Sequence, residues 1–451
     1  MTKKRPLTAY GLFERRVPRY TSYPPAPVFT TGTGAAFANS CLERLDPDEP
    51  VSVYVHIPFC ERLCWFCACR TQGTTSARPV EAYVETLTQE IARLAAALPD
   101  GVRMGRLHWG GGTPTILSPV LIGKLGQVIR EALPPTEAFE FSVEIDPTLI
   151  DGAKVTALAA EGMTRASIGI QDFAPKVQEA IGREQSFEQT RDCVTALRGS
   201  GIASLNADMV YGLPHQTPES ILASLDKVLA LDPDRLALFG YAHVPWMAKR
   251  QRMIDEAALP DDPARHALYG AVSDTLIENG YDPIGIDHFA RPDDGLSRAA
   301  RTGRLRRNFQ GYTDDTCPTL IGLGASAISS FRLGYVQNVA STRDYSAAIR
   351  DGRSATVRGH VHSPEDKARA RAIEMLMCDF TLDLDALDCV TQEIGEALES
   401  ICHEVAADFS PYAMLRGRVL TIRPEGHPLI RIIAHAFDAY HPAEARYSRV
   451  S

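Results

Sequence analysis

The stretch VSVYVHIPFCERLCWFCACR (51–70) decides the fold, because an apolar run leads directly into a loop that carries four cysteines. The run at 51–57 is typical of a buried parallel strand. Cys60, Cys64 and Cys67 follow it with the spacing CxxxCxxC. A [4Fe-4S] cluster has four irons, so three thiolates leave one iron without a protein ligand. The spacing therefore predicts a cluster with one open iron.

The open iron is a position at which S-adenosylmethionine can chelate. A cluster that donates one electron to the sulfonium cleaves a C–S bond and releases a 5'-deoxyadenosyl radical. A structural zinc site is the alternative, with Cys69 as a fourth ligand. Structural zinc sites usually separate two short ligand pairs by a longer spacer, and no second pair follows here. The pattern therefore favours radical chemistry.

The composition describes an ordinary globular chain of 451 residues, with 45% hydrophobic and 23% charged residues. We expect one large catalytic domain with appended segments. The N-terminus has no apolar signal region and no long hydrophobic span is evident, which predicts a cytoplasmic protein without a membrane anchor. A net charge of -9 argues against a nucleic-acid partner. No coiled coil is evident, so we expect a monomer.

Six apolar runs alternate with helical patterns such as 79–97 and 218–231. The runs lie at 51–57, 105–109, 140–146, 165–170, 204–210 and 235–241. This alternation predicts an α/β fold, a partial (βα)6 TIM-like barrel of parallel strands with right-handed crossovers. We expect three segments along the chain, an extended N-terminal arm at 1–50, a catalytic domain at 51–360 and a small, mainly helical C-terminal domain at 361–451. In that last domain, the sequence predicts a helix at 365–380 and a strand at 420–424.

Polar residues cluster where these strands end, which is where folds of this kind place their sites. HWGGGTPT (108–115) follows the second strand and lets a ligand approach the backbone closely. Glu144, Gln171 and Asp208 lie in or just after the next three strands. Buried carboxylates need partners, and a cofactor with hydroxyl and ammonium groups offers them. Each residue alone could be a structural hydrogen-bonding group.

Three further features leave alternatives open. The segment RLRRNFQGYT (304–313) suits a flat apolar substrate with several carboxylates, or is a solvated basic patch. Arg183 either reaches a carboxylate or ends a helix on the surface. GLGASAIS (322–329) resembles a glycine-rich turn that opens a helix, and does not fit the dinucleotide fingerprint.

Taken with these features, several further motifs make the chain similar to the oxygen-independent coproporphyrinogen III oxidases over nearly its full length. They are PRYTSYP (18–24), YVHIPFCERLCWFCAC (54–69), SVEIDP (142–147), QDF (171–173), DMVYGLPHQT (208–217), YAH (241–243), DHFARPDD (287–294), NFQGYT (308–313) and LGASAIS (323–329). The resemblance implies decarboxylation of two propionates of coproporphyrinogen III to vinyl groups, giving protoporphyrinogen IX in haem biosynthesis. Similar radical enzymes that deliver haem generally lack the arm and Cys69. Radical enzymes that open or methylate haem are a second alternative.

The resemblance also implies a site. Cys60, Cys64 and Cys67 would hold one [4Fe-4S] cluster beside two S-adenosylmethionine molecules. The first of these would meet Tyr54, Phe66, Gly111, Glu144 and Ile328, and the second Gly112, Thr113, Gln171, Arg183, Asp208 and Ala242. Cys69, Arg19 and Tyr20 are candidate catalytic residues, with the arm as a hypothetical substrate lid. An electron donor and an electron acceptor are implied as partners.

The cluster loop departs from the family pattern at two positions. Ala68 and Arg70 stand where we expect glycine and asparagine. Arg70 adds a positive charge near the site, which puts the cluster potential or a substrate contact in question but not the cluster itself.

Overall fold

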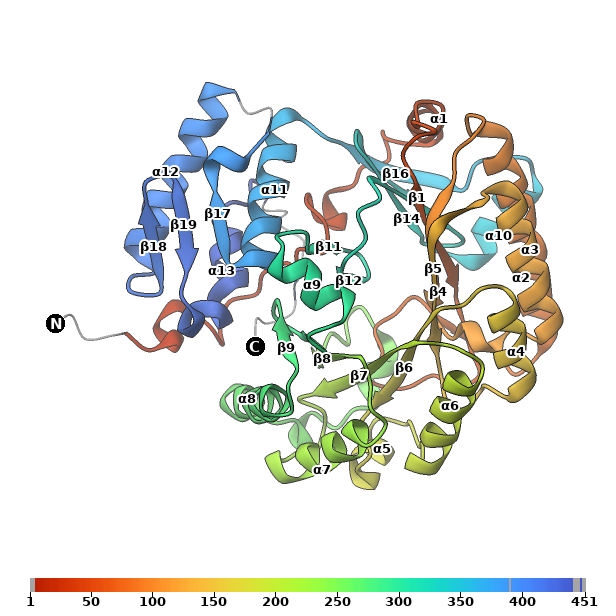
Figure 1. Ribbon diagram of the computed structural model, residues 1–451, viewed down its shortest axis with the longest axis horizontal. Coiled ribbons are helices and arrows are strands. Elements are labelled where there is room, and N and C mark those ends of the chain that lie inside the picture. Colours follow the sequence, from red (N-terminus) through yellow and green to blue (C-terminus); the bar gives the residue numbers. More distant parts are fainter. Residues whose placement is uncertain (1–4, 389–390, 441–446, 448–451) are drawn as a thin grey trace. The chain divides into compact units, whose positions relative to one another are not determined.

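The computed structural model describes residues 5–388, 391–440 and 447, and contacts group the chain into two compact units (Figure 1). The larger unit contains residues 30–260 and 317–361. The smaller unit contains the described residues within 1–29, 261–316 and 362–451. Both units are therefore discontinuous in sequence and cross the boundaries expected at 50 and 360. The division into functional segments stays a prediction.

A parallel sheet forms the centre of the larger unit. Its strands are β1 (Val51–Ile57), β4 (Met104–Gly111), β5 (Pro135–Ile145), β6 (Arg165–Gln171), β7 (Ser204–Tyr211) and β8 (Arg235–Gly240). They pair in this order, and every neighbouring pair is parallel. The predicted fold class, with six parallel βα units, is confirmed.

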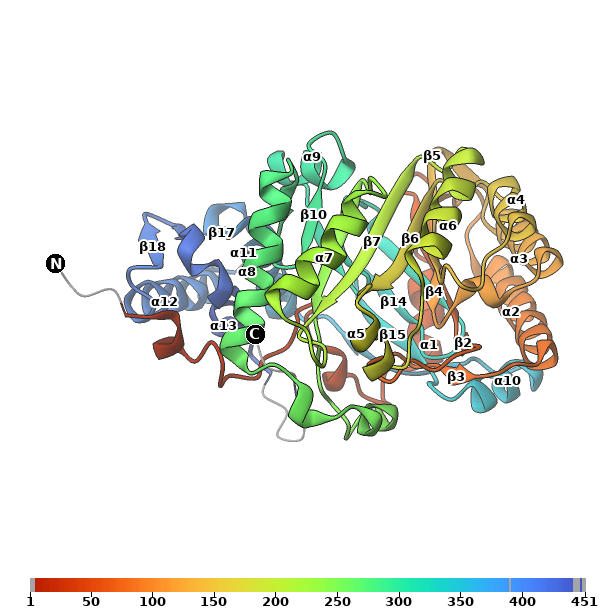
Figure 2. The ribbon, with the colours of Figure 1, turned by 90° about the horizontal axis from the view of Figure 1, so that it is seen from below.

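Helices cover the outer side of this sheet (Figures 1 and 2). They are α2 (Ala77–Ala97), α3 (Pro119–Ala132), α4 (Gly152–Ala160), α5 (Pro175–Ala180), α6 (Phe187–Gly199) and α7 (Pro218–Leu229). The start of α7 shows how local sequence sets the beginning of a helix. Thr217 and Ser220 form a reciprocal capping box, and Pro218 occupies the first turn, where its missing N–H costs nothing. The helix predicted at 218–231 is confirmed and begins at its expected residue.

The sheet extends beyond the predicted strands on the β1 side. β13 (Thr319–Leu323) pairs parallel with β1, and β14 (Ile328–Phe331), β15 (Gly334–Asn338) and β16 (Thr356–Val361) continue antiparallel. The expectation that 322–329 opens a helix was wrong, because this segment joins two strands. A Cβ at Gly322 would lie 2.5 Å from the Ile328 carbonyl oxygen, so glycine there permits a close backbone approach. α1 (Ala35–Leu42) and α10 (Thr342–Arg350) complete this region.

The smaller unit has its own apolar core. α11 (Pro364–Asp379), α12 (Gln392–Asp408) and α13 (Ile430–His435) pack with the antiparallel sheet β17–β19–β18. These strands span Thr381–Asp383, Val419–Ile422 and Ala413–Arg416 respectively. The helix and strand predicted at 365–380 and 420–424 are both present. Leu12, Tyr20 and Tyr23 are buried in the same core, so this part of the arm is packed within the unit.

The remaining helices and strands are the following. They are β2 (Phe59–Cys60), β3 (Gln72–Gly73), α8 (Asp262–Glu278), β9 (Asp282–Ile284), β10 (His288–Ala290), α9 (Gly295–Arg301), β11 (Arg306–Asn308) and β12 (Gly311–Thr313). Within the described ranges, no helix is both long enough and apolar enough to cross a membrane. Outside the cysteine-rich segment 60–69, Cys41, Cys193, Cys378 and Cys402 are buried thiols, Cys317 is partly exposed, and Cys389 lies outside the described residues.

Candidate active site

The cluster loop, residues 58–73, leaves the carboxyl end of β1 and is tied down at several points. The Gln72 amide donates to the Pro58 carbonyl (2.8 Å), and the short strands β2 and β3 pair in parallel. In the middle of the loop, the Trp65 amide donates to the Ile181 carbonyl (2.8 Å). The loop backbone is therefore held at its ends and at its centre.

Each of the three predicted ligand sulfurs accepts a hydrogen bond. The donors are the Thr113 hydroxyl to Cys60 (3.5 Å), the Arg183 guanidinium to Cys64 (3.5 Å) and the Cys69 amide to Cys67 (3.4 Å). Such donors favour the thiolate form, and hydrogen bonds to the sulfurs help to set the potential of an iron–sulfur cluster. Within the described ranges, no group of three or more His, Cys, Asp or Glu side chains is placed to hold a single metal ion. The donor set fits a cluster held by three thiolates.

Hydrogen bonds, burial and nearby charges shift the pKa values of the loop cysteines in different directions. The hydrogen bond from the Cys69 thiol lowers the pKa of Cys67 to about 6, and Arg250 and Arg183 add to the effect. The donating Cys69 thiol has its own pKa raised well above the usual range by the same interaction. Burial raises the pKa of Cys60. Cys69 thus acts here as a donor to a ligand sulfur.

The glycine run at the end of β4 lies against the end of β1 and the start of the cluster loop. The Gly112 amide donates to the Ile57 carbonyl and the Thr113 amide to the Phe59 carbonyl, both at 2.8 Å. A Cβ at Gly112 would lie 2.5 Å from the Phe59 carbonyl oxygen. The close approach that the structure shows here is to backbone of the protein itself, and the approach of a ligand to this run stays a prediction.

Glu144, at the end of β5, is held by two donors. Its carboxylate accepts from the Gly111 amide (3.0 Å) and pairs with the His108 ring (3.4 Å). Desolvation raises the pKa of Glu144, but the bonds and charge of His108 and the Gly111 amide outweigh it and lower that pKa overall. The His108 ring in turn stacks on Tyr54, with ring centroids 5.7 Å apart. Glu144 is therefore ionised at neutral pH.

Arg183 is buried, with an exposed fraction of 8%, so the surface alternative is wrong. It pairs with Asp146 at 3.3 Å and donates to the Gly169 carbonyl at 2.8 Å. Desolvation lowers the pKa of Arg183, but Asp146 and the Cys64 sulfur outweigh this and raise it. A fixed cation therefore stands beside one ligand sulfur.

The remaining strand-end residues also have defined surroundings. Asp208 accepts from the Ser167 hydroxyl (3.1 Å) and the Asn206 amide (2.7 Å), which fixes its carboxylate on β7. Gln171 has a left-handed backbone, with φ of 69°, at the end of β6. This conformation is uncommon outside glycine and often occurs at functional sites.

All the predicted cofactor contacts lie in the larger unit. Tyr54 and Asp208 lie within β1 and β7, and Ile328 begins β14. The others lie at or after the carboxyl ends of parallel strands; they are Phe66, Gly111, Gly112, Thr113, Glu144, Gln171, Arg183 and Ala242. Sequence reasoning gave no role to His108, Asp146 and Gln251, which contact Glu144, Arg183 and the Phe66 carbonyl, or to Arg250, whose charge acts on Cys67. His108 and Asp146 lie within the quoted motifs, but the partner of each is distant in sequence, so the local pattern did not show the contact.

Arg19 and Tyr20 belong to the smaller unit. Arg19 is exposed, whereas Tyr20 is 5% exposed and its hydroxyl donates to Asp438 at 3.0 Å and lies 2.8 Å from the His435 ring. Burial and Asp438 raise the pKa of Tyr20 far above its usual range. Tyr20 therefore has a packing role in this unit, and its catalytic role stays a prediction.

The basic segment 304–313 is not uniformly solvated. The Arg307 side chain, 4% exposed, lies 3.9 Å from Asp287 and stacks over the Tyr312 ring at 4.3 Å. Arg304 is exposed. The interpretation as a solvated patch is therefore wrong for Arg307, whose charge is matched inside the unit.

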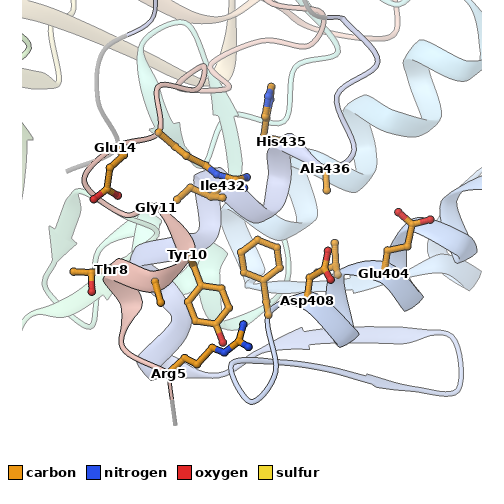
Figure 3. Close-up of a pocket in the computed structure, with 14 residues that line it drawn as sticks. Arg5, Thr8, Tyr10, Gly11, Glu14, Glu404, Asp408, Ile432, His435 and Ala436 are labelled. Carbon is orange, nitrogen blue, oxygen red and sulfur yellow. The ribbon is translucent and has the colours of Figure 1, made fainter. Parts of the chain in front are cut away.

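A separate cavity of 710 Å³ lies in the smaller unit (Figure 3). Its wall includes residues of the turn at Leu7–Tyr10, Asp408 of α12 and His435 of α13, together with Arg5 and Glu14 on either side of the turn. None of the predicted site residues lines it.

Comparisons with known proteins show the family of the chain. Residues 54–228 match the model of the radical SAM superfamily. An oxygen-independent coproporphyrinogen III oxidase of Cereibacter sphaeroides is 58% identical over all of both chains, and one of Paracoccus denitrificans is 52% identical over 99% of each. The solved coproporphyrinogen III oxidase of Escherichia coli, described as a radical SAM enzyme, is 36% identical, with a TM-score of 0.89 over 95% of this chain and 100% of that one. The chain belongs to the family of oxygen-independent coproporphyrinogen III oxidases, within the radical SAM superfamily.

Proposed function

We propose that the protein catalyses the anaerobic oxidative decarboxylation of coproporphyrinogen III to protoporphyrinogen IX in haem biosynthesis. Two propionates become vinyl groups, with loss of two CO2 and two hydrogens. The observation that carries the proposal is the set of three loop cysteines whose sulfurs each accept a hydrogen bond, in a full-length relative of these oxidases.

Cys60, Cys64 and Cys67 would hold the [4Fe-4S] cluster. With S-adenosylmethionine bound, the cluster supplies a 5'-deoxyadenosyl radical able to remove a hydrogen β to a propionate carboxylate. Two S-adenosylmethionine molecules are proposed, in contact with the residues named for each above. The ionised Glu144 carboxylate is suited to accept hydrogen bonds from cofactor hydroxyl or ammonium groups.

The surrounding residues support this site by orientation and by exclusion of water. Arg183 is fixed by Asp146, so its charge stays beside Cys64. Trp65 and Phe66 pack against the apolar cluster around Val177, Ile181 and Leu213. This packing shields one side of the cluster loop from water, which favours strong electrostatic interactions within the site.

An external electron donor is needed because reductive cleavage of S-adenosylmethionine consumes one electron. An electron acceptor is needed because each decarboxylation removes one electron after the radical step. We propose a monomeric, cytoplasmic enzyme, in line with the sequence-based expectations. We also propose Cys69 as a positioning residue, since its amide and thiol both donate to Cys67.

The first experiment is a product assay on the anaerobically reconstituted protein with S-adenosylmethionine, a reductant, a cell-extract acceptor and coproporphyrinogen III. Protoporphyrinogen IX together with 5'-deoxyadenosine is the expected result. Deoxyadenosine without decarboxylated product would refute the proposed substrate. Tight stoichiometric haem binding without product would instead favour a haem-delivery role.

Glu144→Gln is expected to weaken S-adenosylmethionine binding about tenfold, which is about 1.4 kcal/mol, because a charge-assisted acceptor becomes neutral. Iron content should not change. In the parent protein the pKa of Glu144 is lowered, so its contribution persists at neutral pH and is lost only as pH falls through that lowered value. Binding affinity between about pH 8 and 6 should therefore show no step from this group. Calorimetry under anaerobic conditions measures the affinity for S-adenosylmethionine and its pH dependence. Unchanged affinity in the variant would contradict the assignment.

The arm prediction can be sharpened by the structure. Deleting residues 1–30 is expected to abolish turnover and leave cluster absorbance, but it also removes Leu12, Tyr20 and Tyr23 from a core. Arg19→Gln avoids this, because Arg19 is exposed and its carbonyl can still accept from Arg307. We expect the KM for the porphyrinogen to rise about tenfold, because glutamine cannot form the ion pair that Arg19 would make with a substrate carboxylate.

The matched control for this variant is Arg16→Gln, an exposed arginine on the same arm. It should leave the KM unchanged. Equal KM values for the Arg19→Gln variant and the parent protein would remove Arg19 from the substrate site.

A further inference from the structure

The segment after β8 contains a fully buried amide among charged residues. Gln251 lies in the short 3-10 turn Lys249–Met253, and its exposed fraction is 0%, whereas its neighbour Arg252 is exposed. Burying an amide costs free energy unless each of its polar atoms finds a partner. Its partners therefore show why glutamine occupies this position.

All polar groups of Gln251 bond to main chain. Its Nε2 donates to the Phe66 carbonyl (2.7 Å) and to the Ala242 carbonyl (3.0 Å), and its Oε1 accepts from the Val244 amide (2.6 Å). The orientation of the side-chain amide is unambiguous, because carbonyl oxygens can only accept and the Val244 N–H can only donate. One side chain thus joins the cluster loop to the loop after β8.

The neighbouring residue strengthens the same connection. The Arg250 guanidinium donates to the Thr71 carbonyl (3.1 Å) and to the Thr71 hydroxyl (2.8 Å). Phe66 and Thr71 lie on either side of Cys67 in the chain. The turn at Lys249–Met253 is therefore attached to the cluster loop both before and after a ligand cysteine.

We propose that Gln251 is a positioning residue that fixes the carbonyls of Phe66 and Ala242 as acceptors for S-adenosylmethionine. This inference rests on the proposed function, in which these residues contact two different cofactor molecules. A carbonyl oxygen has two lone pairs. Gln251 occupies one on each carbonyl, which leaves one for an N–H donor such as an adenine amino group.

Gln251 also couples the two cofactor sites. A shift of either carbonyl moves the shared amide, and the amide moves the other carbonyl. Two ligands that bias one element have linked affinities, and this linkage is reciprocal. Removing the amide is therefore expected to weaken binding at both sites rather than at one.

The test compares Gln251→Met and Gln251→Glu with the parent protein. Methionine keeps the length and packing but makes none of the three bonds. Glutamate keeps an acceptor for the Val244 amide but, when ionised, loses both donors. For both variants we expect the dissociation constant of S-adenosylmethionine to rise about tenfold at each site, with iron and sulfide per chain unchanged. Anaerobic calorimetry gives the affinities and the stoichiometry.

Arg93→Met is the matched control for lost hydrogen bonds. The Arg93 guanidinium donates to the main-chain carbonyls of Ile349 and Arg353, elsewhere in the larger unit. This variant should lower the unfolding temperature without changing S-adenosylmethionine affinity. Arg252→Gln, on the exposed side of the same turn, should change neither.

The outcomes separate the two proposals. Parent affinity in both Gln251 variants, with only a lower unfolding temperature, would overturn the positioning role. Loss of affinity at one site alone would overturn the coupling. If the parent protein binds S-adenosylmethionine and Gln251 matters, but coproporphyrinogen III is not decarboxylated, the positioning role stands and the proposed function fails.

Discussion

Replacing Cys60, Cys64 or Cys67 by Ser, one at a time, is expected to remove the iron–sulfur cluster and abolish 5'-deoxyadenosine formation. A serine hydroxyl is a poor substitute for a thiolate ligand, and the site has three protein ligands with none in reserve. Iron and sulfide per chain and visible absorbance after anaerobic reconstitution measure the cluster. Deoxyadenosine measured by chromatography reports the radical chemistry.

Two further cysteines serve as controls. Cys69→Ser should keep the cluster, because Cys69 is not assigned as a ligand. The hydrogen bond from the backbone amide of residue 69 to the Cys67 sulfur also remains in this variant. Some loss of activity is expected, since a hydrogen bond to a ligand sulfur, which helps to set the cluster potential, is weakened. Cys193→Ser, in a buried position on α6, should retain both cluster and activity. Iron loss in the Cys69→Ser variant would show that the ligand assignment is wrong.

The parallel core and the cluster loop could be predicted from local patterns. Each strand is a short apolar run bounded by turn residues, and each helix repeats its apolar face with the helical period. The cysteine spacing is local as well. Because parallel strands end on one side of the sheet, the positions of Gly112, Glu144, Gln171 and Asp208 follow from the strand order alone.

Features that depend on long-range contacts could not be predicted. Gln251 sits in KRQRM, a run that resembles a solvated surface, and its burial follows from the loops it joins. β13 pairs beside β1 although the two lie far apart in sequence. Arg183 was ambiguous, because its partner Asp146 comes from another strand end. In each case a distant partner, absent from the local pattern, decides the structure.

Gly112→Ala is expected to reduce turnover at least about 100-fold, the loss that a misplacement of about 1 Å causes at an active site. The added Cβ would lie 2.5 Å from the Phe59 carbonyl oxygen and 2.8 Å from the Ile57 carbonyl oxygen and the Phe59 nitrogen. These are backbone atoms, so no side chain can rotate away. The glycine run or the cluster loop must shift, and stability should fall by about 1–3 kcal/mol, as in other overpacked sites.

The expected cause of the loss is a steric clash of the added Cβ. Gly123→Ala is the control, because it makes the same substitution where no such clash arises. Gly123 lies in α3, where an added Cβ meets only the Glu161 carboxylate oxygen, at 3.9 Å. Alanine there should stabilise the protein by about 0.5–1 kcal/mol, since glycine weakens a helix interior. Unfolding temperature, S-adenosylmethionine affinity and product formation are measured for both variants. Parent-like turnover with Gly112→Ala would mean that the glycine run need not contact the cluster loop closely. Gly112 would then have no role in placing Thr113 beside Cys60.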